Sequence, residues 1–334
     1  MTERRIMTMA VQRYDRTQAL INGTVMIPDM YVMGAPPRTS VEGVVSGNFD
    51  VGEMPVARYL FLREQGEAFT AIPVFPDRLF VQQYVYTRPD TGIKTLADLK
   101  GKRVMVSGYF ITASFWHRAM LQEQGVQPQD IDWYTFYPER DARMKPPLEV
   151  KTTFMPAEQL GVTRLLDGSV DALMLEATPP ITREQDSQMV RVQGDIGNVQ
   201  REWYRKHKFH IAVHIVAVRQ AAVDERPELI EDLCKGFDDA KALAYNVLQN
   251  ERQTSMPLMR TYIDETRELF GDDPWPYGYD ANKAEMDQLL DHVSAQGFLK
   301  RRLKPEDLFD EPARKYKFTA AMPFGSEPFI HPMP

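Results

Sequence analysis

The sequence predicts an α/β protein of two lobes, with a cleft between the lobes and extra helices at its C-terminal end. Short β-rich runs alternate with helical patterns through about the first 220 residues, which is typical of a mainly parallel sheet. From about 224 to 300 the pattern becomes helical. The 334 residues suffice for two domains, or for one divided domain with a sizeable core.

Seven runs are expected to be strands: residues 8–13, 69–75, 80–86, 103–108, 132–137, 171–177 and 209–218. Helical patterns lie between several of them, at about 39–46, 54–65, 95–100, 112–124 and 157–167. The clearest amphipathic helix is "RPELIEDLCKGFDDAKALAYNVLQNE", in which Pro227 suits a first-turn position and Cys234 a buried one. From residue 304 the tail is expected to wrap irregularly over the surface.

Two segments are predicted to cross between the lobes. One is the turn at residues 89–92, and the other is the long β run at 209–218. They place residues 1–90 and 212–334 in the first lobe and residues 91–211 in the second. Because ligands of open α/β sheets bind beyond the carboxyl ends of the strands, we expect the site in the cleft between the lobes.

Composition and charge exclude several classes of function. A net charge of -7 and a pI near 5.5 argue against nucleic-acid binding. The single cysteine rules out an internal disulfide and a cysteine-rich metal site. No apolar stretch is long enough for a membrane span, and no apolar run follows the N-terminal arginines as an export signal would require. We therefore expect a cytoplasmic protein with no membrane partner.

No phosphate-binding glycine loop and no nucleophile elbow occurs, so neither a nucleotide nor a flavin is expected. Three histidines, His207, His210 and His214, raise the question of a metal. They lie in or beside the β run at 209–218, where four residues span about 13 Å, which is too far for His210 and His214 to chelate one ion. We therefore expect no metal and no cofactor. His214 is interpreted as a single imidazole near the cleft floor, or else as a hydrogen-bonded core residue.

In the stretch "SGYFITASFWHRAMLQEQG" at residues 107–125, a strand is expected to end in Ser-Gly, and after two aromatic residues a helix is expected to begin. Such a start has unpaired N–H groups and a partial positive charge, which suit a carboxylate ligand. Trp116 is expected to be core and His117 a bystander, and Thr112 alone would serve equally as an N-cap. The members expected to face the cleft are Tyr109, Thr112, Ala113 and Ser114.

Further charged residues follow apolar runs. Arg78 in "IPVFPDRLF" would match a carboxylate in bidentate geometry. Glu53 is expected just after a short strand and just before a helix, either to compensate the helix dipole or to act as a site acid. Glu176 in "EATPP" ends a strand of the second lobe and is expected to face the cleft. The stretch "RYDRT" sets three candidates at the end of the first strand, where the alternative is an Asp-initiated turn: Asp15, Arg16 and Thr17.

Motifs along nearly the whole chain, from about residue 10 to 310, resemble a known family. "IKTLADLKGKRVMV" and "LLDGSVDALM" are similar to phrases of the type II periplasmic-binding-protein fold. "YDRT", "IPVFP" and "WPYG" resemble the 4,5-dihydroxyphthalate decarboxylase family, which is built on that scaffold. The chain departs from the family at "GEMPVARY", at "FHIAVH" and over residues 137–153.

This resemblance implies a cofactor-independent carboxy-lyase that converts a 4,5-dihydroxyphthalate-like diacid into protocatechuate and CO2. We also expect a homo-oligomer. Direct loss of CO2 would leave an aryl anion that cannot delocalise into the ring, so protonation of the carboxylate-bearing carbon should come first. The proton donor is assigned to His214 or Glu53, and the group that polarises the phenol to Asp15 or Glu176. The grip on the carboxylates is assigned to Arg16, Arg78 and the helix start at 109–114.

Two alternatives use the same scaffold. One is a solute-binding receptor for an aromatic or carboxylate solute, which ranks second because no export signal is visible. The other is an enzyme resembling chorismate dehydratase, whose chains are usually shorter.

Overall fold

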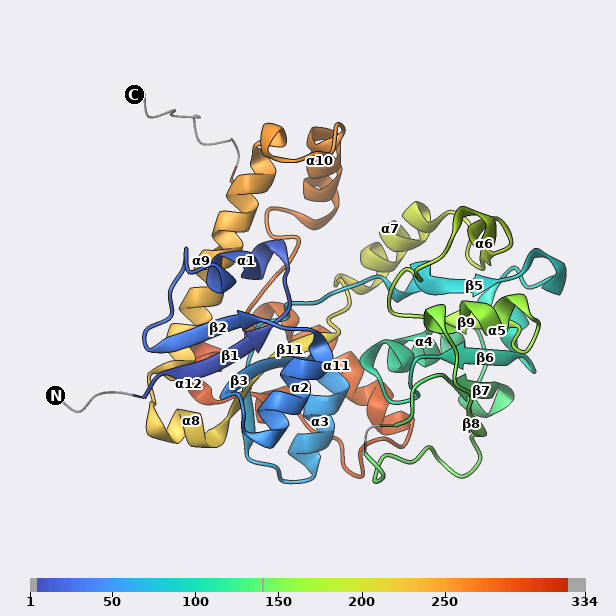
Figure 1. Ribbon diagram of the computed structural model, residues 1–334, viewed down its shortest axis with the longest axis horizontal. Coiled ribbons are helices and arrows are strands. Elements are labelled where there is room, and N and C mark those ends of the chain that lie inside the picture. The colour runs from blue at the N-terminus through green and yellow to red at the C-terminus, as the bar shows by residue number, and fades with distance from the viewer. Residues whose placement is uncertain (1–4, 140, 324–334) are drawn as a thin grey trace.

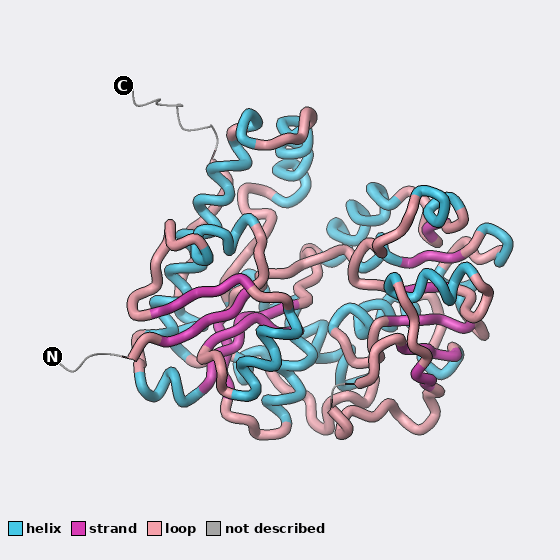
Figure 2. The backbone as a smooth tube through the Cα atoms, viewed as in Figure 1, coloured by secondary structure: helices cyan, strands magenta, loops and turns pink. Residues whose placement is uncertain are grey.

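The computed structural model describes residues 5–139 and 141–323, which form two lobes around two separate groups of strands (Figures 1 and 2). The first sheet has the order β2 (Met30–Gly34), β1 (Met7–Val11), β3 (Val51–Pro55), β11 (His214–Arg219), β4 (Phe69–Ile72). The second has the order β10 (Val190–Arg191), β5 (Val85–Thr87), β9 (Ala172–Met174), β6 (Arg103–Val106), β7 (Asp132–Thr135), β8 (Thr152–Phe154). The predicted two-lobed α/β class is confirmed.

Helices surround both sheets. They are α1 (Asp15–Ile21), α2 (Pro37–Ser46), α3 (Val56–Glu64), α4 (Thr112–Glu123), α5 (Val162–Leu166), α6 (Arg183–Ser187), α7 (Ile196–His207), α8 (Gln220–Glu225), α9 (Leu229–Gln249), α10 (Met259–Phe270), α11 (Tyr279–Ala295) and α12 (Glu311–Lys315). Short 3-10 helices are η1 (Val81–Tyr84), η2 (Pro89–Thr91), η3 (Leu96–Leu99), η4 (Pro128–Asp130), η5 (Gln159–Gly161), η6 (Glu251–Gln253) and η7 (Pro305–Leu308). Within the described residues, none of the helices combines the length and the apolar character that crossing a membrane requires.

The C-terminal helices are not a separate layer. The helix α9 packs along α1, and α9 and α10 project beyond α1 at the top of Figure 1. The helix α11 packs against α4 of the second lobe, so the C-terminal section holds the two lobes together. Cys234 on α9 is fully buried, as its position in the amphipathic pattern predicts.

The pairing of β11 with β3 brings His214 close to Glu53. The returning strand β11 runs antiparallel between β3 and β4, with His214 opposite Pro55 and Val216 opposite Glu53. Successive side chains of a strand point to opposite faces, so His214 and Val216 share a face with Glu53. His214 and Glu53 are therefore diagonal neighbours, within reach of each other's long side chains.

The division of the chain into lobes at 90 and 212 remains a prediction, with one correction. The strand Val85–Thr87, assigned to the first lobe from the sequence, pairs with β9 and β10 in the second sheet. The change of sheet therefore occurs between β4 and β5 rather than near residue 90. The run at 80–86 was expected to be one strand, but η1 occupies most of it.

Two other expectations about strands were wrong. Glu53 lies within β3 rather than after it. The β run at 209–218 becomes a continuous strand only from His214, because the preceding residues make only an isolated bridge between Arg78 and Ala212. The strand β2 was missed, since every one of its side chains is at least partly exposed and the apolar signal of a buried strand is weak.

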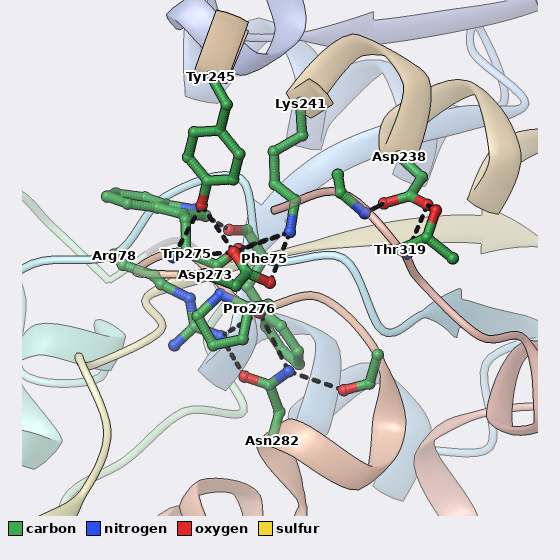
Figure 3. Close-up of polar contacts among 12 residues, drawn as sticks. Phe75, Arg78, Asp238, Lys241, Tyr245, Asp273, Trp275, Pro276, Asn282 and Thr319 are labelled. Atoms are coloured by element: carbon green, nitrogen blue, oxygen red, sulfur yellow. Dashed lines mark hydrogen bonds and ion pairs between the residues drawn. The ribbon is translucent and has the colours of Figure 1, made fainter. Parts of the chain in front are cut away.

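Arg78 fastens both crossing segments to α11. Its side chain is fully buried, and its Nη1 lies 2.9 Å from Oε2 of Glu285. It also donates to the carbonyl of His210. Figure 3 shows its contacts with the carbonyl of Pro276 and the side chain of Asn282. The other oxygen of Glu285 accepts from the backbone N–H of Ala212. Arg78 was predicted to bind the substrate. Its guanidinium is instead buried and bonded to other parts of the protein, which corrects that assignment.

Replacing Arg78 tests this structural role. R78M leaves the buried carboxylate of Glu285 without its partner, so we expect the free energy of unfolding to fall by about 3–5 kcal/mol. Urea denaturation followed by circular dichroism measures the change. The matched control is D239N, which removes the exposed Lys235–Asp239 pair on α9 and should cost less than about 1 kcal/mol. Equal, small losses in the two variants would contradict the assignment.

Candidate active site

A cavity of about 730 Å³ lies between the lobes, where the sequence predicts the cleft. The first lobe supplies Gln12, residues 36–38, Val41, Glu42, Val45, Pro55, Arg58, Asp77, Leu79, Val213 and His214. The second lobe supplies residues 111–113, residues 137–139, Glu176 and Ala177. We call this cavity the interlobe cleft. It holds four of the predicted site residues: Thr112, Ala113, Glu176 and His214.

Glu53 lies behind the wall of the cleft and is fully buried. Its Oε1 accepts hydrogen bonds from the Tyr14 hydroxyl at 2.8 Å, from Nε2 of Gln12 at 3.0 Å and from Nδ1 of His214 at 2.6 Å. Its Oε2 accepts from the backbone N–H of Gln12 at 2.8 Å. A carboxyl surrounded by four donors is held ionised, so Glu53 is placed to orient other groups and not to donate a proton.

His214 is the cleft-facing member of this pair. With Nδ1 engaged by Glu53, Nε2 is the ring nitrogen left for a ligand. Burial by itself lowers the pKa of His214, but the hydrogen bond and the charge of Glu53 raise it above its ordinary value, helped by Asp77 and Glu176. Burial by itself raises the pKa of Glu53, but the hydrogen bond and charge of His214, together with the hydrogen bonds from Gln12, more than offset burial and lower the pKa. Both directions favour an imidazolium–carboxylate pair.

Two more carboxyls line the cleft. Glu176 follows β9 in the second lobe and accepts a hydrogen bond from the hydroxyl of Ser107. Asp77 comes from the first lobe, and its Oδ2 lies 3.8 Å from Nδ1 of His214. Burial raises the pKa of both carboxyls above the ordinary range. A raised pKa makes each a better proton acceptor, as acid–base work in a cleft requires.

The start of α4 reaches the cleft at its first two residues. Thr112 and Ala113 line the cavity, and N–H groups at the start of a helix have no partner within the helix. The hydroxyl of Thr112 also accepts from the backbone N–H of Ala57 at 3.1 Å, which joins α4 to α3 across the lobes. Thr112 and Ala113 therefore face the cleft, and their binding of a carboxylate remains a prediction.

Arg58 is a cation of the cleft that the sequence analysis missed. It lies in the first turn of α3, and its Nη1 is 3.2 Å from Oδ2 of Asp141 in the second lobe. A guanidinium at the cleft wall suits a carboxylate ligand. The signal in the sequence is a basic residue in "GEMPVARY", five positions after Glu53.

Other members of the opening stretch turn inward. The Tyr109 ring is buried, with the guanidinium of Arg118 3.9 Å from its centre. Ser114 is buried and donates to the carbonyl of Gly108 at 2.8 Å. These two residues do not line the cleft, which corrects their assignment. Trp116 is fully buried, as predicted. His117, predicted to be a bystander, is also fully buried and does not line the cleft, and burial lowers its pKa to about 4.

The residues of "RYDRT" also lie elsewhere. Thr17 is fully buried and bonds to backbone groups at the start of its own helix. Nε of Arg16 donates to the carbonyl of Pro76 at 2.7 Å, and its Nη1 lies 2.9 Å from Oδ1 of Asp15. Asp15 and Arg16 line a separate, second cavity. The expectation that these three residues contact the substrate is therefore corrected.

Asp77 and its neighbour Arg78 point in different directions. Side chains alternate along an extended segment, so Asp77 faces the cleft while Arg78 points into the protein. The prediction that Arg78 contacts the substrate is therefore wrong, and Asp77 lines the cleft instead. Within residues 5–139 and 141–323, no group of three or more His, Cys, Asp or Glu side chains is placed to hold a metal ion.

The fold is shared with solute-binding proteins. The model of the family described as "ABC transporter, phosphonate, periplasmic substrate-binding protein" matches residues 10–185. The alkanesulfonate-binding protein SsuA from Xanthomonas axonopodis pv. citri superposes with a TM-score of 0.54 at 14% identity, covering 92% of this chain and 96% of its own. At that identity the likeness shows the fold alone, and it agrees with the predicted type II periplasmic-binding-protein-like architecture.

Two relatives are similar in sequence. The 4,5-dihydroxyphthalate decarboxylase of Comamonas testosteroni is 31% identical over 315 residues, covering 91% of this chain and 96% of that protein. The 4,5-dihydroxyphthalate decarboxylase of Pseudomonas putida is 28% identical over 209 residues, covering 60% of this chain and 81% of that protein. The chain therefore belongs to the 4,5-dihydroxyphthalate decarboxylase family, within the wider family whose model matches residues 10–185.

Proposed function

We propose that the chain is a carboxy-lyase that decarboxylates a dihydroxylated aromatic dicarboxylate of the 4,5-dihydroxyphthalate type, giving protocatechuate and CO2. The observation that carries the proposal is the His214 imidazole, paired with buried Glu53 and facing a cleft that Glu176 also lines. The names of the two relatives support the same reaction. A cytoplasmic location, a homo-oligomeric state and the lack of a cofactor remain predictions from the sequence.

His214 is the proposed proton donor. Its imidazolium protonates the carboxylate-bearing ring carbon, while the hydroxyl para to that carbon passes its proton to Glu176 and its electrons into the ring. The resulting dienone loses CO2, the electrons of the broken C–C bond restore the aromatic ring, and Glu176 returns its proton to the oxygen. Each turnover consumes one proton, which solvent restores to His214. Asp77 is the second candidate for the acceptor.

Glu53 is a positioning residue in this scheme. It does not line the cleft, but it fixes the ring through Nδ1 and stabilises the imidazolium. Arg58 and the N–H groups at the start of α4 hold the carboxylates. This grip acts on the ground state and the transition state alike, so it orients the ring more than it accelerates the reaction.

Turnover of 4,5-dihydroxyphthalate by the purified protein tests the proposal, followed as release of CO2 and protocatechuate. H214N removes the general acid, so we expect kcat to fall by about 10²–10⁴-fold with KM little changed. The control is H207N, because His207 lies outside the cleft, and it should stay close to wild type. Tight binding without turnover would favour the solute-binding alternative that the periplasmic family model raises. Full activity in H214N would remove His214 as the donor.

The pH dependence tests the role of Glu53. Because Glu53 raises the pKa of His214, the wild type keeps its proton donor above the ordinary range and loses it as the pH rises through that raised pKa. In E53Q the amide cannot stabilise the cation, so the alkaline limb of the kcat profile should move to lower pH.

A matched variant controls for the loss of a negative charge near the cleft. Glu42 lines the cleft but pairs with Arg38 at the surface, so E42Q should leave the alkaline limb in place. An unmoved limb in E53Q, or equal movement in E53Q and E42Q, would contradict the role assigned to Glu53.

A further inference from the structure

A second cavity, of about 290 Å³, lies where α9 and α10 meet α1 and the two segments that cross between the lobes. We call it the hinge cavity. Its lining consists of Asp15, Arg16, Phe80, His210, Lys241, Ala244, Tyr245, Leu248, Thr266, Phe270, Pro274 and Trp275. None of these residues lines the interlobe cleft, and the proposed decarboxylation uses none of them.

Aromatic rings form much of the wall. Phe80 and His210 stack with centroids 4.4 Å apart, and Trp275 meets His210 edge-on at 5.2 Å. The centroid of Phe270 lies 6.3 Å from that of Phe80. Such walls favour a flat aromatic guest, which can add further stacked or edge-on contacts. Apolar cavities of about 150 Å³ already admit benzene, so one ring fits here.

The charged groups of the hinge cavity are already paired. Nζ of Lys241 lies 2.9 Å from Oδ2 of Asp273 and donates to the carbonyl of Trp275, while the Tyr245 hydroxyl donates to Asp273 at 2.6 Å (Figure 3). Figure 3 shows Tyr245 and Lys241 pointing from the same helix toward Asp273. Arg16 pairs with Asp15 and with a backbone carbonyl. No charge in this wall therefore calls for an ionic ligand.

His210 supplies the polar contact. Within the described residues, neither of its ring nitrogens takes part in a hydrogen bond, and the ring lines the cavity. Burial, with the charges of Arg78 and Arg16, lowers the pKa of His210 well below its ordinary value, so the ring is neutral. A neutral imidazole offers one donor and one acceptor nitrogen, which matches a hydroxyl group.

We propose that the hinge cavity is a binding site for a small uncharged aromatic molecule that carries a hydroxyl group, a phenol. The aromatic walls hold the ring, and His210 binds the hydroxyl. A carboxylate on the ring would find no unpaired cation in the cavity and would lose its hydration on entry. The hinge cavity thus differs from the interlobe cleft, where the N–H groups at the start of α4 suit a carboxylate.

The test uses 4-fluorophenol and ¹⁹F NMR with the full-length protein. We expect saturable binding with a dissociation constant on the order of 0.1–1 mM, as befits a ligand of so few atoms. Fluorobenzene and 4-fluorobenzoate should each bind at least about tenfold more weakly, since a lost hydroxyl contact or a buried charge costs 1.4 kcal/mol or more. Equal binding of all three probes would overturn the assigned ligand class.

Cavity-filling variants locate the site. A244F on α9 and T266F on α10 each fill the hinge cavity, and both should abolish saturable binding of 4-fluorophenol. L243F is the matched control, because Leu243 is 39% exposed and lies outside the cavity. Circular dichroism identifies the filling variants that fold. Unchanged binding in a folded filling variant would overturn the proposal.

Two further measurements test the role of His210 and the location of the bound phenol. H210F keeps an aromatic wall but removes the ring nitrogens, so it should erase the preference for 4-fluorophenol over fluorobenzene. Excess 4,5-dihydroxyphthalate should leave bound 4-fluorophenol in place. Displacement would put the phenol in the interlobe cleft and contradict the proposal. Since all arms read binding and not turnover, a failure here is distinguishable from a failure of the proposed decarboxylation.

Discussion

The hydrogen bond between Glu53 and His214, 2.6 Å long, is the interaction on which the proposed chemistry depends. A fully buried carboxylate is costly unless donors surround it. Here a tyrosine hydroxyl, an amide side chain, a backbone N–H and the imidazole all point at it. Glu53 binds Nδ1 of His214, so Nε2 is the ring nitrogen available to a ligand in the cleft. A single buried charge thereby both orients the histidine and favours its protonated form.

Much of the surrounding architecture serves to bring these two residues together. Glu53 comes from an early strand, whereas His214 lies 161 positions later on the strand that returns from the second lobe. The return is fixed by a second buried pair, Arg78 with Glu285, which ties both crossing segments to α11. The register of β11 against β3 then decides which histidine meets the carboxylate. A slip of one residue would turn His214 to the other face of the sheet.

The sequence predicts the lobes because periodicity and turn residues are local signals. It also predicts residues at positions where the chain direction leaves little choice. Thr112 and Ala113 begin the helix that follows a strand, and His214 lies in a returning strand. The predictions are wrong where the side chains of two neighbouring residues point in different directions. Asp77 and Arg78 follow the same apolar run, and only the three-dimensional path decides which of them reaches the cleft. Asp15 and Arg16 begin a helix whose start turns to the hinge cavity instead, a choice that depends on packing by the distant residue Trp275.

The protonation state of His214 is the central claim, and ¹⁵N NMR of histidine-labelled protein measures it directly. The chain has six histidines, so the spectrum of H214N assigns the signal. The structure predicts a titration midpoint for His214 above that of an unperturbed histidine, about 6.5, and both ring nitrogens protonated below that midpoint. A midpoint at or below the unperturbed value, with a neutral ring beside an ionised Glu53, would contradict the account.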